Sequence, residues 1–471
     1  MPEPEPRKLL LKVILALFFL LLLLAGGAVL ILWLKPHRST SARLLLPDGT
    51  TVSVAGTTFG TNHVIGGTLA RLVARTPWGM QVALGRLLGS GVVTHQALST
   101  PTPTLVVWLD SPTIAPASPP RPFLGWYEGY LADTNGFVSG SDQTFYPGVG
   151  GLFAMQFSAF PRRNRTLALH FYFHDTQGKV KQCGTLTVLN PEFRAYSQWQ
   201  PETLPATKMV GDVKATLIQV TTGLGNDMSY SPLPDGGHVV TFSTNHDDGR
   251  NETGCCLLLR SPTDSSQIWQ VDHVELSDAT GNVLRSTSMS SGGADDIFSF
   301  GPSLWTNESA WKLRCEIKRT KGFAAGELFT FKNVPVPEML QTNYPGWATN
   351  VNGVTVTLDH IIRRPSLTNL NGGWSTSQLS EAHFRMTGLS NDLHLDLIEI
   401  RADNGTNVES PSSSTGDNMQ DRYLRNIPPE TKTLDFTFAV QRGRWVEFLV
   451  KPETGSGRFE FPAPPKSKTA K

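Results

Sequence analysis

Few residues of this chain have types and spacing that could do chemistry. The most regular are two carboxylate pairs, because the spacing of Asp272 and Glu275 recurs at Asp396 and Glu399. Residues three apart on a strand point to opposite faces, so each pair is poorly placed for paired-carboxylate catalysis. We therefore interpret both pairs as solvated sheet edges, and their recurrence as a structural feature.

Other combinations are weaker. His170 and His174 share one face of a predicted strand but lie ~13 Å apart at ~3.3 Å per residue, too far to share a metal ion. The acidic loop at 245–249 lacks the ligand series of a calcium-binding loop, and no Gly-x-Ser-x-Gly elbow occurs. We predict no catalytic residue, no cofactor and no metal site.

A basic segment at residues 66–89 interrupts the repeat described below. Its apolar residues, Trp78 among them, have the spacing of a helix. Its charged residues are Arg71, Arg75 and Arg86, which makes the segment a candidate membrane or partner surface. The alternative that we favour is a short helix packed over the first domain, because Trp78 and the leucines favour burial.

A second candidate surface is aromatic. Trp126, Tyr127 and Tyr130 cluster beside a predicted turn, and such rings can line a sugar- or peptide-binding face. Packing of these three side chains in the core is the interpretation that we favour.

Composition narrows the class of protein. The 471 residues have room for about three domains. A net charge of +1 gives no argument for a nucleic-acid partner. Only 17% of residues are charged, while 43 are Gly and 33 are Pro, a mix that favours a β-rich extracytoplasmic protein. Four cysteines are too few for a disulfide scaffold and leave one or two bonds possible.

The N-terminal region contains a candidate membrane segment. Residues 13–34 carry no charge and follow Arg7, Lys8 and Lys12, and a helix crosses a bilayer core with ~20 residues. The apolar run continues past the small residues at 25–28, so we interpret it as an uncleaved signal anchor rather than a cleaved signal peptide. We expect the remaining chain to lie in the periplasm or outside the cell.

The remaining chain contains three copies of one unit. Six short matches link the first and second copies in the same order, including residues 111–113 with 261–263 and the alternating apolar runs at 167–173 and 311–317. A fainter third copy has its alternating run at 434–440. Period-two alternation predicts strands with one buried face, and short strands between turn signals predict a β-sandwich.

The breaks between copies are rich in proline, at 198–205 and at 334–347. We predict an all-β fold in which a single transmembrane helix precedes three tandem sandwiches, the first with a short helical insert. The predicted division is a cytoplasmic tail with signal anchor at 1–40, sandwiches at 41–200, 208–337 and 348–460, and a flexible tail at 461–471.

The second copy resembles the immunoglobulin-like sandwich. That family has a Cys, a Trp on the next core strand and a second Cys in the facing sheet. Cys255, Trp269 and Cys315 keep this order, whereas the other copies lack the Cys pair. The resemblance implies three tandem immunoglobulin-like units and a candidate disulfide between Cys315 and Cys255 or Cys256. We favour Cys255 because it shares its strand face with leucines; buried free thiols are the alternative.

The chain is also similar to membrane-anchored bacterial proteins that share a Pro-Asp-Gly start, at 47–49, and a Trp-x-Pro-Glu-x-Leu-Pro joint, at 199–205. That resemblance implies no activity. We interpret the chain as a single-pass, membrane-anchored extracytoplasmic binding, adhesion or envelope-scaffold protein. The expected partners are the membrane, through 13–34, and an envelope protein or glycan. Two alternatives remain: an envelope hydrolase acting on glycan or peptide near the 66–89 insert, and a polysaccharide-binding module.

Overall fold

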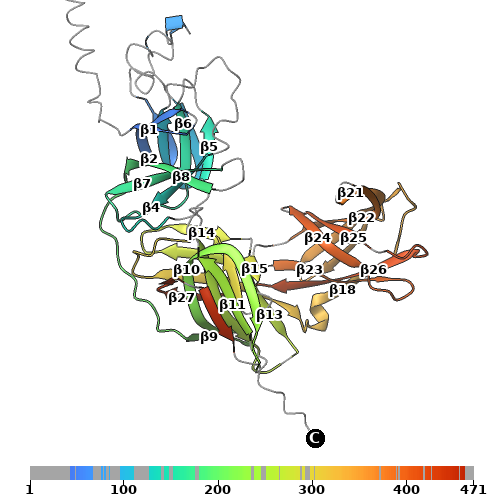
Figure 1. Cartoon of the computed structure of the whole chain (residues 1–471). Coiled ribbons are helices and arrows are strands. Elements are labelled where there is room, and N and C mark those ends of the chain that lie inside the picture. Colours follow the sequence, from blue (N-terminus) through green and yellow to red (C-terminus); the bar gives the residue numbers. More distant parts are fainter. Residues whose placement is uncertain are drawn as a thin grey trace, which may run out of the picture.

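The fold is all-β, as the sequence predicts (Figure 1). The computed structural model describes residues 43–66, 96–110, 127–138, 143–147, 152–174, 180–234, 238–244, 251–301 and 303–461, apart from short gaps, and isolated positions between 76 and 84. The predicted membrane segment and nearly all of the predicted helical insert lie outside the described residues. Within the part of the chain that is described, no helix has the length and apolarity needed to span a membrane.

The first sandwich is built from two antiparallel sheets with the strand orders β1-β2-β3-β6-β5 and β4-β7-β8. The strands are β1 (Arg43–Leu45), β2 (Thr51–Ile65), β3 (Gln96–Asp110), β4 (Tyr127–Ala132), β5 (Gln143–Pro147), β6 (Leu152–Phe157), β7 (Thr166–His174) and β8 (Val180–Leu189). The alternation predicted for β7 is observed, because Leu167, Leu169 and Phe171 are all buried in the core. Strands β7 and β8 follow each other in sequence and pair directly.

The second sandwich has an eight-stranded sheet whose main path is β15-β16-β12-β10-β11-β29, faced by a sheet of order β14-β13-β17-β27. Its strands are β9 (Ala206–Val210), β10 (Val213–Pro232), β11 (His238–Thr244), β12 (Glu252–Arg260), β13 (Ile268–Asp278), β14 (Val283–Ser286), β15 (Met289–Ser291), β16 (Ile297–Phe300), β17 (Trp311–Lys321), β27 (Arg444–Val450), β28 (Glu453–Thr454) and β29 (Gly457–Phe461). The last three strands come from the end of the described chain, so the second sandwich is discontinuous in sequence.

The third sandwich consists of a sheet of order β18-β26-β23 and one whose main path is β19-β21-β22-β25-β24. Its strands are β18 (Leu328–Pro335), β19 (Thr342–Asn343), β20 (Trp347–Val351), β21 (Val354–Leu370), β22 (Gly373–Thr387), β23 (Leu393–Ala402), β24 (Glu409–Gly416), β25 (Met419–Arg425) and β26 (Thr433–Arg442). A short 3-10 helix, η1 (Ala325–Glu327), precedes β18. In Figure 1 this sandwich projects sideways from the other two.

The second and third sandwiches exchange one strand each. In the first sandwich the last two strands form a hairpin, whereas β17 does not pair with β18, the strand that follows it. Strand β18 crosses to the third sandwich and pairs with β26. The chain then leaves β26 through Gly443 and returns as β27, which pairs with β17. The third sandwich is therefore inserted between two neighbouring strands of the second.

The apolar cores follow a different division. The cores of the first and second sandwiches merge into one cluster, which extends from Leu46 to Val450 and includes Trp305 and Trp311. The core of the third sandwich is a separate cluster around Phe384 and Phe436. Apolar contact therefore joins the first two sandwiches, whereas the third is attached by the exchanged strands and by polar groups.

Candidate functional site

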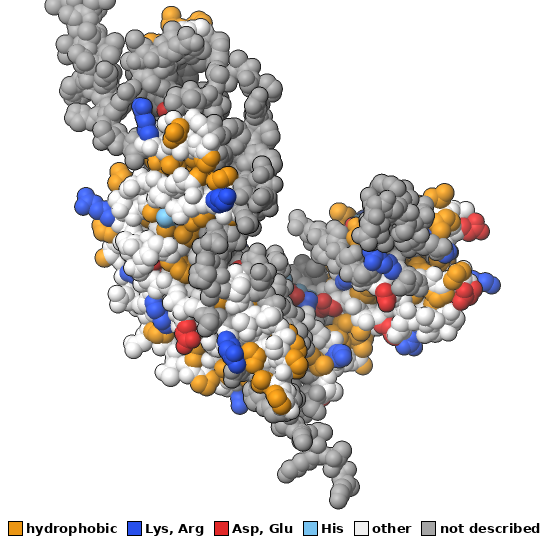
Figure 2. Space-filling view, viewed as in Figure 1, with side chains coloured by type: hydrophobic (Ala, Val, Ile, Leu, Met, Phe, Trp, Pro, Cys, Tyr) orange, Lys and Arg blue, Asp and Glu red, His pale blue; other side chains and the backbone are white. Residues whose placement is uncertain are grey.

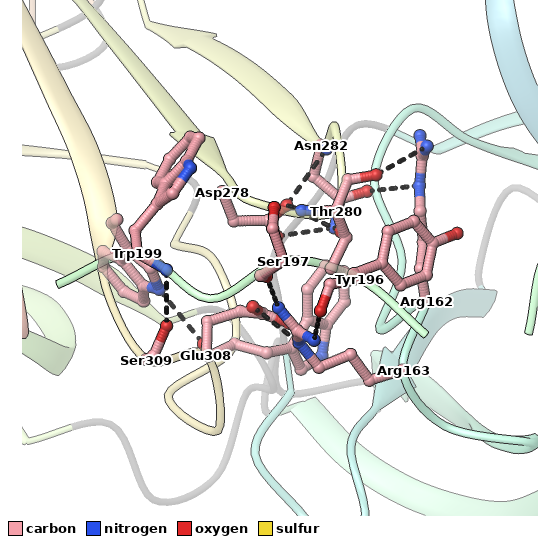
Figure 3. A network of polar contacts seen from close by, with 12 residues as sticks. Arg162, Arg163, Tyr196, Ser197, Trp199, Asp278, Thr280, Asn282, Glu308 and Ser309 are labelled. Atoms are coloured by element: carbon pink, nitrogen blue, oxygen red, sulfur yellow. Dashed lines mark hydrogen bonds and ion pairs between the residues drawn. The ribbon is translucent and has the colours of Figure 1, made fainter. Parts of the chain in front are cut away.

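Two buried polar networks mark the joints between sandwiches. At the first joint, Nε of Arg163 donates to both carboxylate oxygens of Glu308 at 3.0 Å (Figure 3). The same guanidinium donates to the carbonyl oxygens of Tyr196 and Ser197, at 3.1 and 2.6 Å. The Glu308 side chain is only 3% exposed. Arg163 therefore fixes the first sandwich, the following linker and the second sandwich to one another.

A turn of the second sandwich completes the first joint. Nε of Arg162 donates to Oδ1 of Asn282 at 3.1 Å, and its Nη1 donates to the carbonyl of Thr280 at 3.1 Å. Asn282 Nδ2 donates in turn to the carbonyl of Phe160 at 2.9 Å. The Asp278 carboxylate accepts from Thr280 and Asn282, which holds the turn in shape (Figure 3). The turn predicted from sequence is thus the contact surface for the first sandwich.

The second joint contains the denser group of ionisable side chains, and charged side chains gather where the third sandwich meets the second (Figure 2). The second sandwich supplies Asp272, His273, Glu316 and Lys318, and the third supplies His394, Asp396 and Gln441; we call these seven residues the joint cluster. The register of β13 shifts between Val271 and His273, so Asp272 lies at a bulge. A bulge re-aims a side chain, and here it coincides with the carboxylate that faces the third sandwich.

The distances within the joint cluster are short. Nε2 of His394 lies 2.9 Å from Oε1 of Glu316, and its Nδ1 lies 3.5 Å from Oδ2 of Asp272. Nδ1 of His273 lies 2.6 Å from the same Asp272 oxygen and 3.2 Å from Oε2 of Glu316. Both imidazoles therefore stand between the same two carboxylates, with ring centroids 6.1 Å apart.

Lysine and glutamine complete the joint cluster. Nζ of Lys318 lies 2.6 Å from Oδ1 of Asp272 and 2.9 Å from Oδ1 of Asp396. Gln441 donates to the other Asp396 oxygen at 3.0 Å and to the carbonyl of Arg319 at 2.7 Å, and it accepts from the Arg319 N–H at 3.0 Å. The contacts of Lys318 with Asp396 and of Gln441 with Arg319 cross the joint. The contacts of Lys318 with Asp272 and of Gln441 with Asp396 each lie within one sandwich.

The arrangement shifts the proton affinities of its members. Contact with Asp272, and then with Glu316, raises the pKa of His273 to about 9, because both carboxylates favour the imidazolium. Burial raises the pKa of Glu316, but contacts with His273 and His394 outweigh burial and lower that pKa to about 2. Burial likewise raises the pKa of Asp272, and His273 and Lys318 more than offset it, so the net pKa lies well below its usual range.

The joint cluster is able to hold protons or a cation. One ligand atom from each of Asp272, Glu316 and His394 lies within 4.8 Å of the other two. Among the described residues this is the group of histidine, cysteine and carboxylate side chains whose spacing suits a metal ion. The prediction that Asp272 and Asp396 line solvated sheet edges is wrong: both face the joint, with Lys318 between them. Glu275 instead pairs with Arg285 at 2.9 Å.

The two cysteines singled out from sequence lie on facing sheets, Cys255 on β12 and Cys315 on β17. Both are fully buried in the core and are free thiols in this structure. Burial raises the pKa of both thiols, and for Cys255 the neighbouring Cys315 adds to the effect. The disulfide remains a prediction.

The other predicted surfaces are only partly described. Arg71, Arg75 and Arg86 lie outside the described residues, as do Trp126 and the side chain of Tyr127. Tyr130 is 3% exposed and packs edge-on against Tyr172, with ring centroids 5.5 Å apart. Tyr130 therefore belongs to the core, in line with the interpretation that we favour, and contributes nothing to an exposed aromatic face.

Sequence reasoning missed Glu316 and His394, which have no partner nearby in the sequence. The one signal in the sequence was that Asp272 recurs at Asp396, at matching positions of two sandwiches. It points to the joint but not to Glu316 or His394. A scan against protein-family models finds no match to this chain, and a search of curated proteins finds no match either.

Proposed function

We propose that this chain is a single-pass, membrane-anchored extracytoplasmic scaffold or binding protein made of three immunoglobulin-like sandwiches. The observation that carries the proposal is that both joints are fastened, the first by a shared core and the Arg163–Glu308 network, the second by exchanged strands and the joint cluster. Fastened joints hold the loops and edges of separate sandwiches at fixed relative positions. That property serves recognition of an extended partner.

The strand orders support the immunoglobulin-like assignment. In such domains the strands run A-B-E-D in one sheet and C-F-G in the other. The first sandwich has this order in β2-β3-β6-β5 and β4-β7-β8. The third has it in β21-β22-β25-β24 and β23-β26-β18, and the second in β10-β12-β16-β15 and β13-β17-β27. Only the strand at the G position differs in origin: the third sandwich takes β18, which follows β17 in sequence, and the second takes β27, which follows β26.

The proposed anchor rests on the sequence of residues 13–34, which are uncharged and preceded by basic residues. The first sandwich begins shortly after this segment, at Arg43, so the array starts close to the bilayer. The proposed place of the sandwiches is the periplasm or the cell exterior. Carbonate extraction of cell membranes tests the anchor: the full chain stays with the membrane, and a chain lacking residues 1–40 is released.

The binding role is tested by crosslinking in native membranes followed by quantitative mass spectrometry. We expect one stoichiometric envelope protein or glycan with the full chain. Arg163→Ala loosens the first joint and reduces that crosslink, while the matched change Arg194→Ala, at an exposed arginine of the same region, leaves it unchanged. Absence of any stoichiometric partner, together with turnover of glycan or peptide by the purified chain, would favour the hydrolase alternative instead.

A further inference from the structure

The joint cluster holds more negative charge than its lysine neutralises. Asp272, Glu316 and Asp396 supply three carboxylates, and Lys318 supplies one ammonium group. His273 and Arg422, whose charge acts on Asp396, supply further positive charge. Asp272 and Glu316 both lie against the two histidines, and the Glu316 side chain is only 3% exposed. These two carboxylates are therefore the ones that a cation between the histidines would share.

Donor atoms from both sandwiches converge at spacings close to those of a metal site. Nε2 of His394 lies 2.9 Å from Oε1 of Glu316, and Nδ1 of His273 lies 3.2 Å from Oε2 of Glu316. One ligand atom from each of Asp272, Glu316 and His394 lies within 4.8 Å of the other two. A tetrahedral zinc ion with bonds of ~2.0–2.2 Å holds its ligand atoms roughly 3.3–3.6 Å apart. The spacings in the joint cluster lie on both sides of this range, so side-chain shifts of roughly 1 Å bring the ligand atoms around one ion.

His273 supplies an independent indication. Its Nδ1 lies 2.6 Å from Asp272 and 3.2 Å from Glu316, yet this buried atom makes no hydrogen bond of acceptable geometry to either oxygen. This ring nitrogen is close to two carboxylate oxygens but points at neither. Ligand atoms around a shared metal ion have the same arrangement, because each points at the ion and not at its neighbours.

We propose that Asp272, His273, Glu316 and His394 bind zinc at the joint between the second and third sandwiches. Imidazole and carboxylate are both accepted zinc ligands, whereas Mg²⁺ and Ca²⁺ prefer sets made of oxygen alone. Three of the ligands stand on β13 and β17 of the second sandwich, and His394 stands on β23 of the third. The ion therefore links the two sandwiches.

The surroundings support the proposed ligands. Lys318 holds Oδ1 of Asp272, which leaves Oδ2 directed towards both histidines. Gly443, where the chain returns to the second sandwich, lies against the site: a Cβ there would stand 2.1 Å from Oε1 of Glu316 and 2.7 Å from Nε2 of His394. Outer contacts of this kind orient metal ligands.

The test is a titration of the full chain, purified in detergent and stripped with a chelator, with zinc chloride in a calorimeter. We expect one zinc ion per chain. Glu316→Gln and His394→Gln each weaken the affinity by at least ~10-fold. The matched control is His383→Gln, because His383 contacts Asp421 and Asp359 within the third sandwich and is not a ligand; its zinc affinity stays at the wild-type value.

Each variant is first checked for folding by circular dichroism and thermal unfolding in chelator. If one ligand variant fails to fold, the other decides, and His273→Gln provides a third. The visible absorption of cobalt, added in place of zinc, reports on the ligand set and is lost in the ligand variants. The proposal is overturned if the wild-type chain binds no zinc, or if zinc affinity is the same in the folded ligand variants as in wild type.

Discussion

Asp272 and Asp396 occupy matching places in the second and third sandwiches, and they share one ammonium group. Nζ of Lys318 lies 2.6 Å from Oδ1 of Asp272 and 2.9 Å from Oδ1 of Asp396. Each aspartate stands on the strand that pairs with the last strand before the exchange, β13 beside β17 in one sandwich and β23 beside β26 in the other. The exchange thus brings equivalent carboxylates together, and the lysine makes their approach favourable.

Substitution of Lys318 tests this contact first. In chelator, Lys318→Met leaves two partly buried carboxylates without their cation, and we expect a loss on the order of 2–3 kcal/mol in the free energy of unfolding. Urea denaturation measures the loss. The matched control on the same strand is Lys312→Met, whose ammonium group lies 4.0 Å from an exposed Glu447, and it costs less than about 1 kcal/mol. Equal losses for the two variants would contradict the bridging role.

Arg163 should contribute more to the stability of the first joint than the neighbouring exposed arginine. Arg163→Ala leaves the Glu308 carboxylate, 3% exposed, without its bidentate partner, and we expect a loss of about 3–5 kcal/mol. Arg194, which also stacks on Tyr196, is a matched control because its side chain is 65% exposed and lies 3.8 Å from Glu192. Arg194→Ala should leave the stability close to that of the wild type, because solvent screens an exposed ion pair. Thermal unfolding of both variants measures the difference, and a small effect of Arg163→Ala would show that the shared core alone holds the joint.

Engineered disulfides can trap the exchanged strands. Thr330 of β18 stands directly opposite Thr437 of β26, with their hydroxyl oxygens 3.0 Å apart. The double variant Thr330→Cys/Thr437→Cys should oxidise to a crosslink, because directly opposed strand residues have Cα separations suited to a disulfide. Peptide mass spectrometry detects it. The control pair, Thr330→Cys/Arg314→Cys, joins β18 to β17 and should stay reduced; a crosslink there would show that β18 pairs with its sequence neighbour.

The stability of the chelator-treated protein should depend on pH through the joint cluster. The pKa of His273 is raised from 6.5 to about 9, so its contribution is fully present below pH 6.5 and is lost as pH rises through 9. The pKa of Glu316 is lowered from 4.5 to about 2, so its contribution is present above pH 4.5 and is lost as pH falls towards 2. The joint should therefore be most stable between these limits, near pH 4.5–6.5.

Urea denaturation at pH 5.5, 8 and 10 measures this dependence. His273→Gln should reduce the fall in stability between pH 5.5 and 10, and it should also weaken the response to acid because contact with His273 lowers the pKa of Glu316. A variant with the wild-type dependence between pH 5.5 and 10 would mean that His273 does not titrate with the joint.

Thiol reactivity provides a test of the core. Cys255 and Cys315 are fully buried and their pKa values are raised, so iodoacetamide should leave both unmodified in the native protein. Cys183, which is partly exposed, should be alkylated first. Mass spectrometry after labelling, with and without denaturant, follows each site. Rapid native labelling of Cys315 would contradict its place in the core, and a linked Cys255–Cys315 peptide would establish the disulfide predicted from sequence.

Much of the strand content could be predicted from local patterns. Alternating apolar residues mark β7, β17 and β26, and the structure buries the expected faces, for example Leu313 and Phe436. The partners of the last strands could not be predicted, because β18 and β27 have similar apolar patterns. Similar patterns fit either neighbour equally, and the choice depends on contacts between whole sandwiches.

The joint cluster was beyond sequence reasoning for the same reason. The recurrence of Asp272 at Asp396 indicates matching positions, but within either sandwich alone the pattern predicts that each aspartate faces solvent. The bulge at Asp272 and the exchange of strands bring the two together, and neither has a signature in the local sequence. Glu316 and His394 lie on strands without a distinctive sequence pattern, and they contact each other only across the joint.

The insertion of the third sandwich also sets an order of assembly. Synthesis from the N-terminus produces β17 long before β27, with the whole third sandwich made in between. During that interval one edge of the second sandwich stays open, and an open edge is a template for wrong pairing. Strand β18 finds its partner as soon as β26 is made. The sandwich that stands third in the sequence therefore closes before the second, which waits for β27, β28 and β29 at residues 444–461.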